Sequence, residues 1–252
     1  MQRLDDRVVI VTGAGQGIGR AAALHLATLG AAVVAVDINK DKIDGVIDEL
    51  DRQGLSGLAV RTDVSSEASV SELVDAVVKE YGRIDVLFNN AAVFSSLRMK
   101  PMEDISGDEW DQVMAVNLKG AFLCSRAVVP VMKARSQGKI INVSSSTVFL
   151  GRPYYLHYVT SKAGIVGFTR ALAKELAGSG ITVNAIAPGS VQTEVKRDTV
   201  SPAQVEALIG ERCVQRVETP EDLMGALAFL ASSASDFMSG QTIIVDGGQV
   251  VR

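Results

Sequence analysis

The sequence predicts a doubly wound α/β fold with a seven-stranded parallel sheet and helices on both of its faces. Short β-branched runs alternate with longer amphipathic segments along all 252 residues, which is typical of parallel α/β folds. The short runs are almost continuously apolar, as expected of strands that are covered on both faces. A glycine-rich stretch from Thr12 to Gly19 follows the first run directly. This position favours an open nucleotide-binding sheet over a closed (β/α)8 barrel of similar length.

The expected elements follow one another in strict alternation. Strands are expected at residues 8–11, 32–36, 58–61, 86–89, 140–143, 181–187 and 242–245. Helices are expected at residues 18–29, 40–52, 67–80, 108–134, 155–177 and 219–231. Because no linker, repeat or low-complexity tract separates these elements, we expect one domain over residues 1–252.

Composition and charge exclude several classes of function. The net charge is −4 and the pI about 5.3, which argues against a nucleic-acid or acidic-membrane surface. The apolar runs are too short to span a bilayer, and the first residues carry no apolar signal region. Cys124 and Cys213 form no disulfide framework, and with only two histidines no metal site is expected. A reduced, cytoplasmic setting is therefore expected.

The glycine-rich stretch reads Thr-Gly-Ala-Gly-Gln-Gly-Ile-Gly. Glycines at such a turn allow a tight bend and close approach of a ligand to the backbone, and the following helix offers free N–H groups to a pyrophosphate. The spacing departs from Gly-x-Gly-x-x-Gly, and a flexible glycine loop is the alternative interpretation. We expect a Rossmann-type dinucleotide site here, with cofactor contacts from Gly13, Gln16, Gly17, Ile18 and Gly19.

The ends of the next strands carry polar or small residues. Asp37 ends the second strand, where a carboxylate can accept both adenosine ribose hydroxyls and would repel a 2′-phosphate. NAD is therefore expected in preference to NADP, with Lys40 the nearest possible phosphate partner and a simple helix cap the alternative for Asp37. Asp63 and Val64 close the third strand, where the carboxylate would meet the adenine amine or cap a helix. Asn90 follows the fourth strand beside small residues that let a cofactor lie against the backbone.

Tyr158 and Lys162 lie four residues apart in the helix expected at 155–177, so both side chains share one face. A phenol has an ordinary pKa of about 10, and a cation beside it stabilises the phenolate and lowers that pKa. The pair is therefore a candidate general acid/base. By itself the spacing is a weak motif, because a surface lysine one turn from a tyrosine gives the same pattern.

Two further polar positions are candidates for the same site. Three serines, 144–146, follow the strand at 140–143, and ligands of open parallel sheets bind beyond such strand ends. Serines there also form ordinary turns. Asn117 interrupts the long helix expected at 108–134, where asparagine has mediocre helix propensity and tends to bond local backbone. The spacing alone favours a kink over a water-holding role in a proton path.

Taken together, these motifs resemble the short-chain dehydrogenase/reductase family over nearly the whole chain. The family's glycine motif matches residues 12–19, its Asn-Asn-Ala-Gly matches residues 89–92 with Ala92 in place of the glycine, and its Pro-Gly-x-Val-x-Thr matches residues 188–193. Its adenine-side acidic residue matches Asp63. The catalytic set implied by the resemblance is Asn117, Ser145, Tyr158 and Lys162.

The resemblance also implies a role for each residue. Ser145 hydrogen-bonds the substrate oxygen, Tyr158 donates or removes the proton, and Asn117 relays protons through water. Lys162 lowers the pKa of Tyr158 and binds the nicotinamide ribose. Val191 and Thr193 hold the nicotinamide carboxamide.

The expected function is that of an NAD-dependent oxidoreductase that interconverts a small secondary alcohol and its ketone by hydride transfer. A 3-oxoacyl-thioester reductase is the alternative within the family, although such relatives commonly prefer NADPH, and a nucleotide-sensing binding protein is the non-enzyme alternative. Residues 190–213 are expected to form a lid over the site. The candidates for the walls of a largely apolar substrate pocket are Phe94, Phe149, Leu150, Tyr154, Tyr155 and His157, and ordinary packing is the alternative for each. Arg152, beside the catalytic segment, is a candidate to bind an anionic substrate, and a solvated surface arginine is the alternative. The resemblance to the family also implies a homotetramer.

Overall fold

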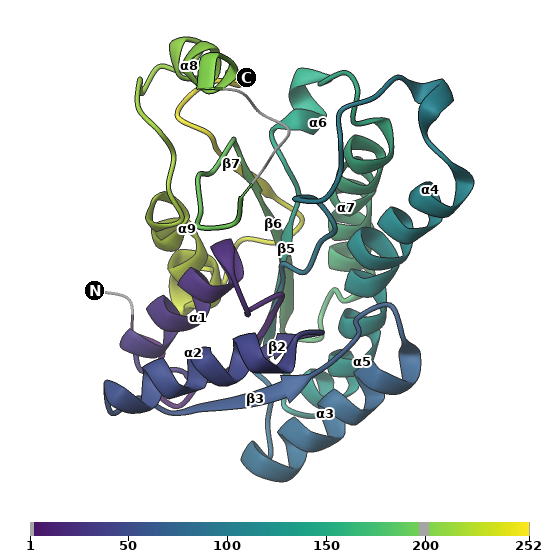
Figure 1. The fold of residues 1–252 in the computed structure, drawn as a ribbon. Helices are drawn as coiled ribbons and strands as arrows, with labels where there is room; N and C mark the ends of the chain where they lie inside the picture. The colour runs from purple at the N-terminus through teal and green to yellow at the C-terminus, as the bar shows by residue number, and fades with distance from the viewer. Residues whose placement is uncertain (1–2, 197–201, 252) are drawn as a thin grey trace.

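The structure, a computed structural model, describes residues 3–196 and 202–251 (Figure 1). Within them, one seven-stranded sheet has the order β3-β2-β1-β4-β5-β6-β7, and all six strand pairings are parallel. The strands are β1 (Val8–Thr12), β2 (Ala32–Asp37), β3 (Gly57–Arg61), β4 (Val86–Asn89), β5 (Gly138–Val143), β6 (Ile181–Pro188) and β7 (Thr242–Val245). This confirms the predicted fold class.

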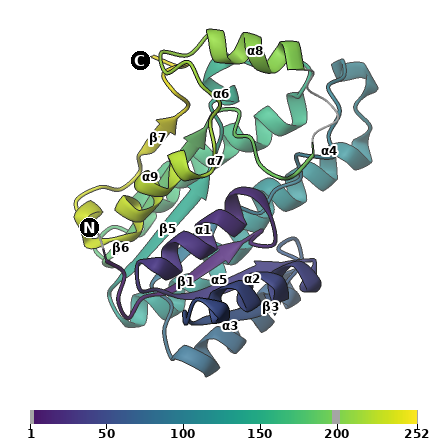
Figure 2. The same ribbon diagram turned by 60° about the vertical axis from the view of Figure 1, so that its left-hand side comes forward.

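Helices cover both faces of the sheet (Figures 1 and 2). They are α1 (Gly17–Thr28), α2 (Lys40–Arg52), α3 (Glu67–Tyr81), α4 (Gly107–Met114), α5 (Gly120–Ala134), α6 (Thr147–Leu150), α7 (Leu156–Glu175), α8 (Pro202–Gly210) and α9 (Glu221–Ala231). Helices α1, α2 and α9 bury Leu26, Leu50 and Leu227 in one core cluster. Helices α3 and α5 bury Leu73 and Leu123 in another.

The strands supply both clusters, because successive side chains of a strand point to opposite faces. In β1, Val9 and Val11 belong to the first cluster, while Val8 and Ile10 belong to the second. All five β1 residues are buried. The continuous apolar character of these runs therefore reflects a sheet that is packed on both sides, as the sequence predicts.

The predicted helix at 108–134 is one continuous run of helical turns with a change of pitch in its middle. Residues Ala115–Lys119 form a π-helical turn between α4 and α5, and Asn117 lies buried within it. Such turns insert an extra residue and often occur at functional sites. The short helix α6 has no counterpart among the predicted helices, and it ends at Gly151 in the left-handed region at φ +60°.

The same stretch, Gly107–Ala134, is the one segment of the described residues that is long and apolar enough to cross a membrane. Its most apolar window has a mean hydropathy of 1.2, and 44% of that window is buried. Helix α5 packs against α3 and against strands β4 and β5. The apolar side chains therefore serve the packing of this layer of the domain.

The strand order reverses between β1, which is followed by the crossover to β2, and β4, which lies on its other side. In open parallel sheets, ligands bind beyond the carboxyl ends of the strands at such a switch point. The segments that follow β1, β2, β3, β4, β5 and β6 all reach this edge, and together they carry the predicted site residues.

Candidate active site

A cleft of about 450 Å³ opens beyond the carboxyl ends of the strands. Most of the residues predicted to bind the cofactor line it. They are Gly13, Gln16, Gly17, Ile18, Asp37, Asp63, Val64, Asn90, Tyr158, Lys162 and Thr193. The structure thus brings the glycine turn, three strand ends and the Tyr–Lys pair to one place.

The glycine turn has the backbone that its sequence suggests. Gly13 and Gly17 have φ values of +66° and +58°, which favour glycine. Gly19 does not line the cleft: a Cβ there would lie 2.0 Å from the Gly13 carbonyl oxygen. Because Gly19 has no side chain, α1 packs closely against the glycine turn. Gly19 therefore contributes to backbone packing, and the cofactor contact expected of it is not found among the residues that line the described cleft.

The start of α1 holds an anionic oxygen in this structure. The Gly17 N–H, at the first position of the helix, donates a hydrogen bond of 2.8 Å to Oε1 of Glu194. Free N–H groups and the helix dipole favour negative charge at this end. The carboxylate stands in for a phosphate oxygen, and with the size of the cleft it indicates that a dinucleotide fits these residues.

Asp37 is fixed beside the glycine turn. Its Oδ2 accepts the Gly15 N–H at 3.1 Å and its Oδ1 accepts the Asn39 N–H at 3.0 Å. The N-cap of α2 is Asn39, whose side chain accepts from the Lys42 N–H. The alternative interpretation of Asp37 as the cap of that helix is therefore wrong, and its half-buried carboxylate faces the cleft.

The basic residue nearest the glycine turn differs from the one suggested by sequence. Lys40 pairs with Asp44 at 2.6 Å on the exposed side of α2. Lys42 instead donates to the Gln16 side chain in the glycine turn. Because α2 is capped by Asn39, Lys42 lies on the side of the helix that faces the glycine turn. Recognition of Asn39 as the cap in the sequence would have identified Lys42 as the basic residue beside this turn.

Asp63 and Asn90 line the cleft, and each makes hydrogen bonds that hold the neighbouring backbone. Oδ1 of Asp63 accepts from the N–H and the hydroxyl of Ser65, at 2.9 and 2.6 Å. The cap of α3 is Ser66, so Asp63 orders the turn before the helix. The Asn90 side chain donates to the Thr12 carbonyl at 3.0 Å and ties the end of β4 to the glycine turn.

Helix α7 carries Tyr158 and Lys162 on one buried face, as predicted. Tyr158 is 8% and Lys162 2% exposed. Nζ of Lys162 donates to the Val143 carbonyl at 2.8 Å and lies 5.9 Å from the centre of the Tyr158 ring. Burial lowers the pKa of Lys162 to about 8. A cation at this distance stabilises a phenolate, and the lowered pKa makes its charge sensitive to pH just above neutrality.

A smaller cavity of about 120 Å³ adjoins the cleft, with Ile18, Phe94 and Tyr158 in the walls of both. Ser145 lines this cavity, and its Oγ accepts from the N–H and the hydroxyl of Thr147, at 3.3 and 2.9 Å. Ser145 and Tyr158 thus face one chamber beside the cleft. This arrangement places a hydroxyl and a phenol where a substrate oxygen would lie next to a bound dinucleotide.

Asn117 and Val191 do not line the cleft. Oδ1 of Asn117 accepts the Val93 N–H at 2.7 Å, and its Nδ2 donates to the Val93 carbonyl and to Ser161 Oγ, both at 3.2 Å. Asn117 therefore joins the loop after β4 to α7. Val191 lines the smaller cavity and is 2% exposed, while Thr193 lines the cleft.

The apolar pocket expected from the sequence forms only in part. Phe94, Leu150 and Tyr155 line the smaller cavity, together with Arg152. His157 does not: it is fully buried, and its Nε2 lies 3.0 Å from Oε1 of Glu109. Phe149 lines a different cavity between the amino ends of β5 to β7 and α7. Tyr154 is 54% exposed and does not line the smaller cavity either. For His157, the alternative of packing is therefore the correct one.

The predicted lid at 190–213 contributes to the chamber from both of its described parts. Ser190 and Val191 line it from the start of the segment, and Gln204 and Leu208 of α8 line it from the other side. Figures 1 and 2 show α8 beside α6 and the C-terminal residues, at the same end of the molecule. Residues 197–201 of the predicted lid lie outside the described residues.

Known proteins resemble this chain over its whole length. A family model described as Enoyl-(Acyl carrier protein) reductase matches residues 13–249. A 3-oxoacyl-[acyl-carrier-protein] reductase of Thermotoga maritima is 39% identical over 251 residues, 99% of this chain and 100% of that protein. A (2S)-[(R)-hydroxy(phenyl)methyl]succinyl-CoA dehydrogenase subunit of Thauera aromatica is 37% identical over 246 residues, 98% of this chain and 97% of that protein.

A solved structure shares the fold closely. The crystal structure of a gluconate 5-dehydrogenase from Burkholderia cenocepacia, in complex with NADP and tartrate, matches with a TM-score of 0.92 at 37% identity. The match covers 98% of this chain and 96% of that chain. These similarities extend over the sheet, the glycine turn and the segment that carries the Tyr–Lys pair.

Proposed function

The chain belongs to the short-chain dehydrogenase/reductase family of oxidoreductases, and we propose that it is an NAD-dependent enzyme that interconverts a secondary alcohol and its ketone. The observation that carries this proposal is the junction of the two cavities. Tyr158 lies in the walls of both, with Lys162 in the cleft and Ser145 in the smaller cavity. A nucleotide and a small substrate would meet there.

Each of these side chains has a chemical task in the proposed reaction. A bound nicotinamide would supply the hydride acceptor or donor. The Tyr158 hydroxyl moves the proton of the substrate oxygen, and the Ser145 hydroxyl, held by Thr147, hydrogen-bonds that oxygen. Nζ of Lys162, anchored on the Val143 carbonyl, keeps a positive charge beside the Tyr158 ring.

The preference for NAD rests on Asp37. Its carboxylate is fixed at the edge of the cleft by two backbone N–H groups, where it favours ribose hydroxyls over a phosphate. The gluconate 5-dehydrogenase structure contains NADP, and Lys42 beside Gln16 is the group of this chain that would partly compensate a phosphate. Two backbone N–H groups fix the Asp37 carboxylate, whereas the exposed Lys42 is held only through the Gln16 side chain, so NAD is the proposed cofactor.

The size and walls of the smaller cavity support a compact substrate. The cavity measures about 120 Å³ and combines apolar side chains with Thr147, Arg152 and Gln249. Reduction of a 3-oxoacyl thioester is the second candidate, favoured by the 39% identity to the Thermotoga maritima enzyme over the whole chain. A nucleotide-sensing protein is the non-enzyme alternative, but it would have no need of a buried acid/base pair.

A substrate panel tests the proposal. The purified protein is mixed with NADH or NADPH and a set of small ketones, keto acids and a 3-oxoacyl thioester, and the loss of nicotinamide absorbance is followed. Turnover with ketones or keto acids supports the proposed function. Turnover with the thioester alone would move the assignment to the second candidate, and nucleotide binding without turnover on any substrate would favour the sensor.

Assembly and location extend the proposal. We expect a cytoplasmic homotetramer acting on a small-molecule substrate, without a nucleic-acid or membrane partner. Light scattering coupled to size exclusion measures the solution mass. A mass of one chain, 26.6 kDa, would contradict the tetramer and leave the chemistry to be judged by the substrate panel.

A further inference from the structure

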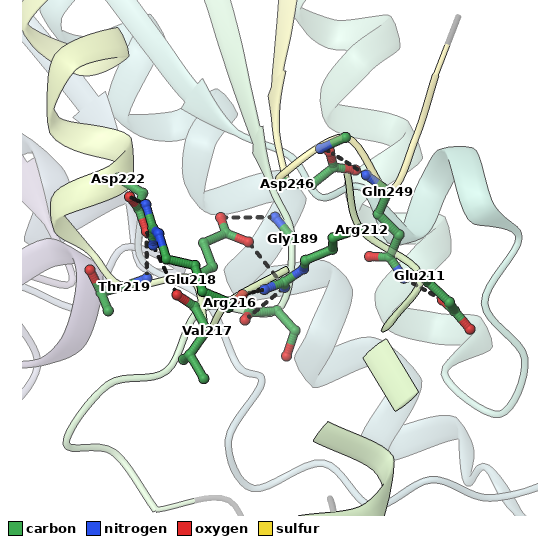
Figure 3. Close-up of polar contacts among 12 residues, drawn as sticks. Gly189, Glu211, Arg212, Arg216, Val217, Glu218, Thr219, Asp222, Asp246 and Gln249 are labelled. Carbon is green, nitrogen blue, oxygen red and sulfur yellow. Dashed lines mark hydrogen bonds and ion pairs between the residues drawn. The ribbon is translucent and has the colours of Figure 1, made fainter. Parts of the chain in front are cut away.

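A buried ion pair lies directly beneath the turn that leads from β6 to the cleft (Figure 3). Arg212 follows α8, and Glu218 lies shortly before α9; their exposed fractions are 4% and 5%. Nη2 of Arg212 lies 3.3 Å from Oε2 of Glu218. Neither residue lines the 450 Å³ cleft, and only Arg212 borders a neighbouring cavity under the lid, so the pair is not part of the site described above.

The pair contacts every residue from Gly189 to Gln192. Oε1 of Glu218 accepts the Gly189 N–H at 3.3 Å, and the Glu218 carbonyl accepts the Gln192 N–H at 2.8 Å. Nη2 of Arg212 donates to the Ser190 carbonyl at 3.2 Å. Val191 forms a parallel β-bridge with Glu218. Figure 3 shows the Glu218 carboxylate between Gly189 and Arg212.

The carboxylate also packs against the turn without space to spare. A Cβ on Gly189 would lie 2.5 Å from Oε2 of Glu218 and 2.9 Å from Cβ of Asp246. Gly189 is therefore required as glycine by its neighbours in this arrangement. The turn cannot approach the carboxylate any further without displacing it.

The surroundings of Glu218 shift the pKa of its carboxyl in both directions. Burial raises its pKa to about 7, and the carboxylates of Asp246 and Asp222 act in the same direction, while the Arg212 guanidinium and the Gly189 N–H lower it. Arg216 is the other charged group nearby, and it pairs with Asp222. A buried ion pair of this kind gives little stability compared with apolar packing of the same volume. Its contribution is directional hydrogen bonds, which go to residues 189–192 and, from Nη1 of Arg212, to the Arg216 carbonyl at 3.0 Å.

We propose that Glu218 and Arg212 are positioning residues that hold residues 189–192 in the form that receives the nicotinamide end of the cofactor. The proposal rests on the proposed function, in which Val191 and Thr193 approach the nicotinamide. Val191 lies within the held segment and Thr193 directly follows it, so a shift of the turn would displace both. The adenosine end depends on the glycine turn and Asp37, which make no hydrogen bond to Glu218 or Arg212 among the described contacts.

Two nucleotides separate this role from a general effect on folding. NADH carries the nicotinamide ring, whereas ADP-ribose has the adenosine, the pyrophosphate and the second ribose without that ring. Isothermal titration calorimetry gives the Kd of both ligands for wild type, Glu218→Gln and Glu218→Ala. We expect Glu218→Ala to weaken NADH binding about tenfold with the ADP-ribose Kd unchanged, and Glu218→Gln, which keeps the oxygen facing Gly189, to lie between.

The control is Glu206→Gln, because Glu206 is an exposed carboxylate of α8, the helix just before Arg212. It should leave both Kd values at the wild-type level. The pH gives a second readout: the ratio of NADH to ADP-ribose affinity should fall as the pH drops below about 7 in wild type, because Glu218 becomes neutral. In Glu218→Gln this dependence should be absent.

The outcomes are distinct for this proposal and for the proposed function. Wild type that binds neither ligand would refute nicotinamide binding itself. Wild type that binds NADH, with variants that bind it equally well, would overturn the positioning role alone. Equal weakening of NADH and ADP-ribose in both variants would also overturn it, since the pair would then support the whole domain instead of one turn.

Discussion

At the scale of single residues, the site depends on charges held at fixed places by the backbone. Lys162 is buried with its Nζ on a strand carbonyl and its charge beside the Tyr158 ring. Asp37 is held by two N–H groups on the edge of the cleft. Neither charge is free to follow a ligand. Substitution at either position should therefore change one step of the reaction and leave the fold in place.

Replacing Lys162 with alanine should weaken cofactor binding and raise the pH at which alcohol oxidation becomes fast. The cation that favours the phenolate is lost, so the kinetic pKa should move upward toward that of a free phenol. Steady-state rates across pH 6–10 measure the shift, with Lys174→Ala, an exposed change near the end of the same helix, as the control. An unchanged profile with an unchanged cofactor KM would rule out this role.

Replacing Asp37 with alanine should lower kcat/KM for NAD and raise it for NADP. Repulsion of a 2′-phosphate by the carboxylate, at ~4 Å and an effective dielectric near 20, is worth about 2–3 kcal/mol after screening, on the order of a hundredfold. Rates with both cofactors on both proteins decide the matter, and Asp44→Asn on the exposed side of α2 is the control. Equal use of NAD and NADP by wild type would contradict the proposal and point to Lys42.

At the scale of elements, the sequence was a good guide wherever a local pattern determines the structure. All seven strands agree with the predicted ranges within two residues, because their apolar runs are bounded by turns. The Tyr–Lys pair shares a buried face of α7, as the helical spacing requires. Helix propensity placed an irregularity at Asn117, but it could not show that this is a π-helical turn, because contacts of Asn117 with Val93 and Ser161, distant in the chain, stabilise it.

The lid supplies a prediction at the same scale. Oε1 of Glu194 accepts the Gly17 N–H, where a cofactor phosphate would be held. Replacing Glu194 with alanine should therefore tighten NADH binding several-fold, because the phosphates no longer compete with a carboxylate for the helix end. Calorimetric titration measures the Kd, and Glu206→Ala, an exposed carboxylate of α8, is the control. Weaker binding by the Glu194 variant alone would show that this carboxylate assists the cofactor.

At the scale of the whole molecule, the contacts that no sequence pattern predicts join distant parts of the chain. Glu194 and Gly17 are 177 positions apart. Gly189, just after β6, and Glu218, just before α9, are 29 positions apart. Neither contact leaves a periodic or compositional pattern, so only the assembled fold reveals them. Both contacts involve the segment after β6: Glu194 connects it to the glycine turn of the cleft, and Gly189 connects it to the buried Glu218.

The buried carboxylate should also affect the stability of the whole domain. The folded-state pKa of Glu218 is about 7 and its ordinary value 4.5, so between these values the folded chain keeps a proton that the unfolded chain has lost. The contribution of Glu218 to stability therefore falls as the pH rises from about 4.5 to 7. Relative to Glu218→Gln, wild type should lose about 2 kcal/mol of unfolding free energy over this range.

Urea unfolding of both proteins at pH 5 and pH 8 measures this difference. The comparison cancels the titration of other carboxylates, including Asp222, whose pKa the Arg216 guanidinium lowers to about 2. A difference between the two proteins that is independent of pH, or that grows in favour of wild type as the pH rises, would show that Glu218 is ionised throughout this range in the folded chain.

The central claim is that Tyr158 is the proton-transferring group of a nicotinamide-dependent oxidoreductase, and the Tyr158→Phe variant tests it most directly. The ring and its packing remain, so the Kd for NADH should stay near the wild-type value. Turnover of the best substrate from the panel, followed at the nicotinamide absorbance band, should fall by far more than tenfold, while Tyr81→Phe at the end of α3 should keep full activity. A Tyr158→Phe enzyme that retains more than about a tenth of wild-type kcat, a loss below ~1.4 kcal/mol, would contradict the claim.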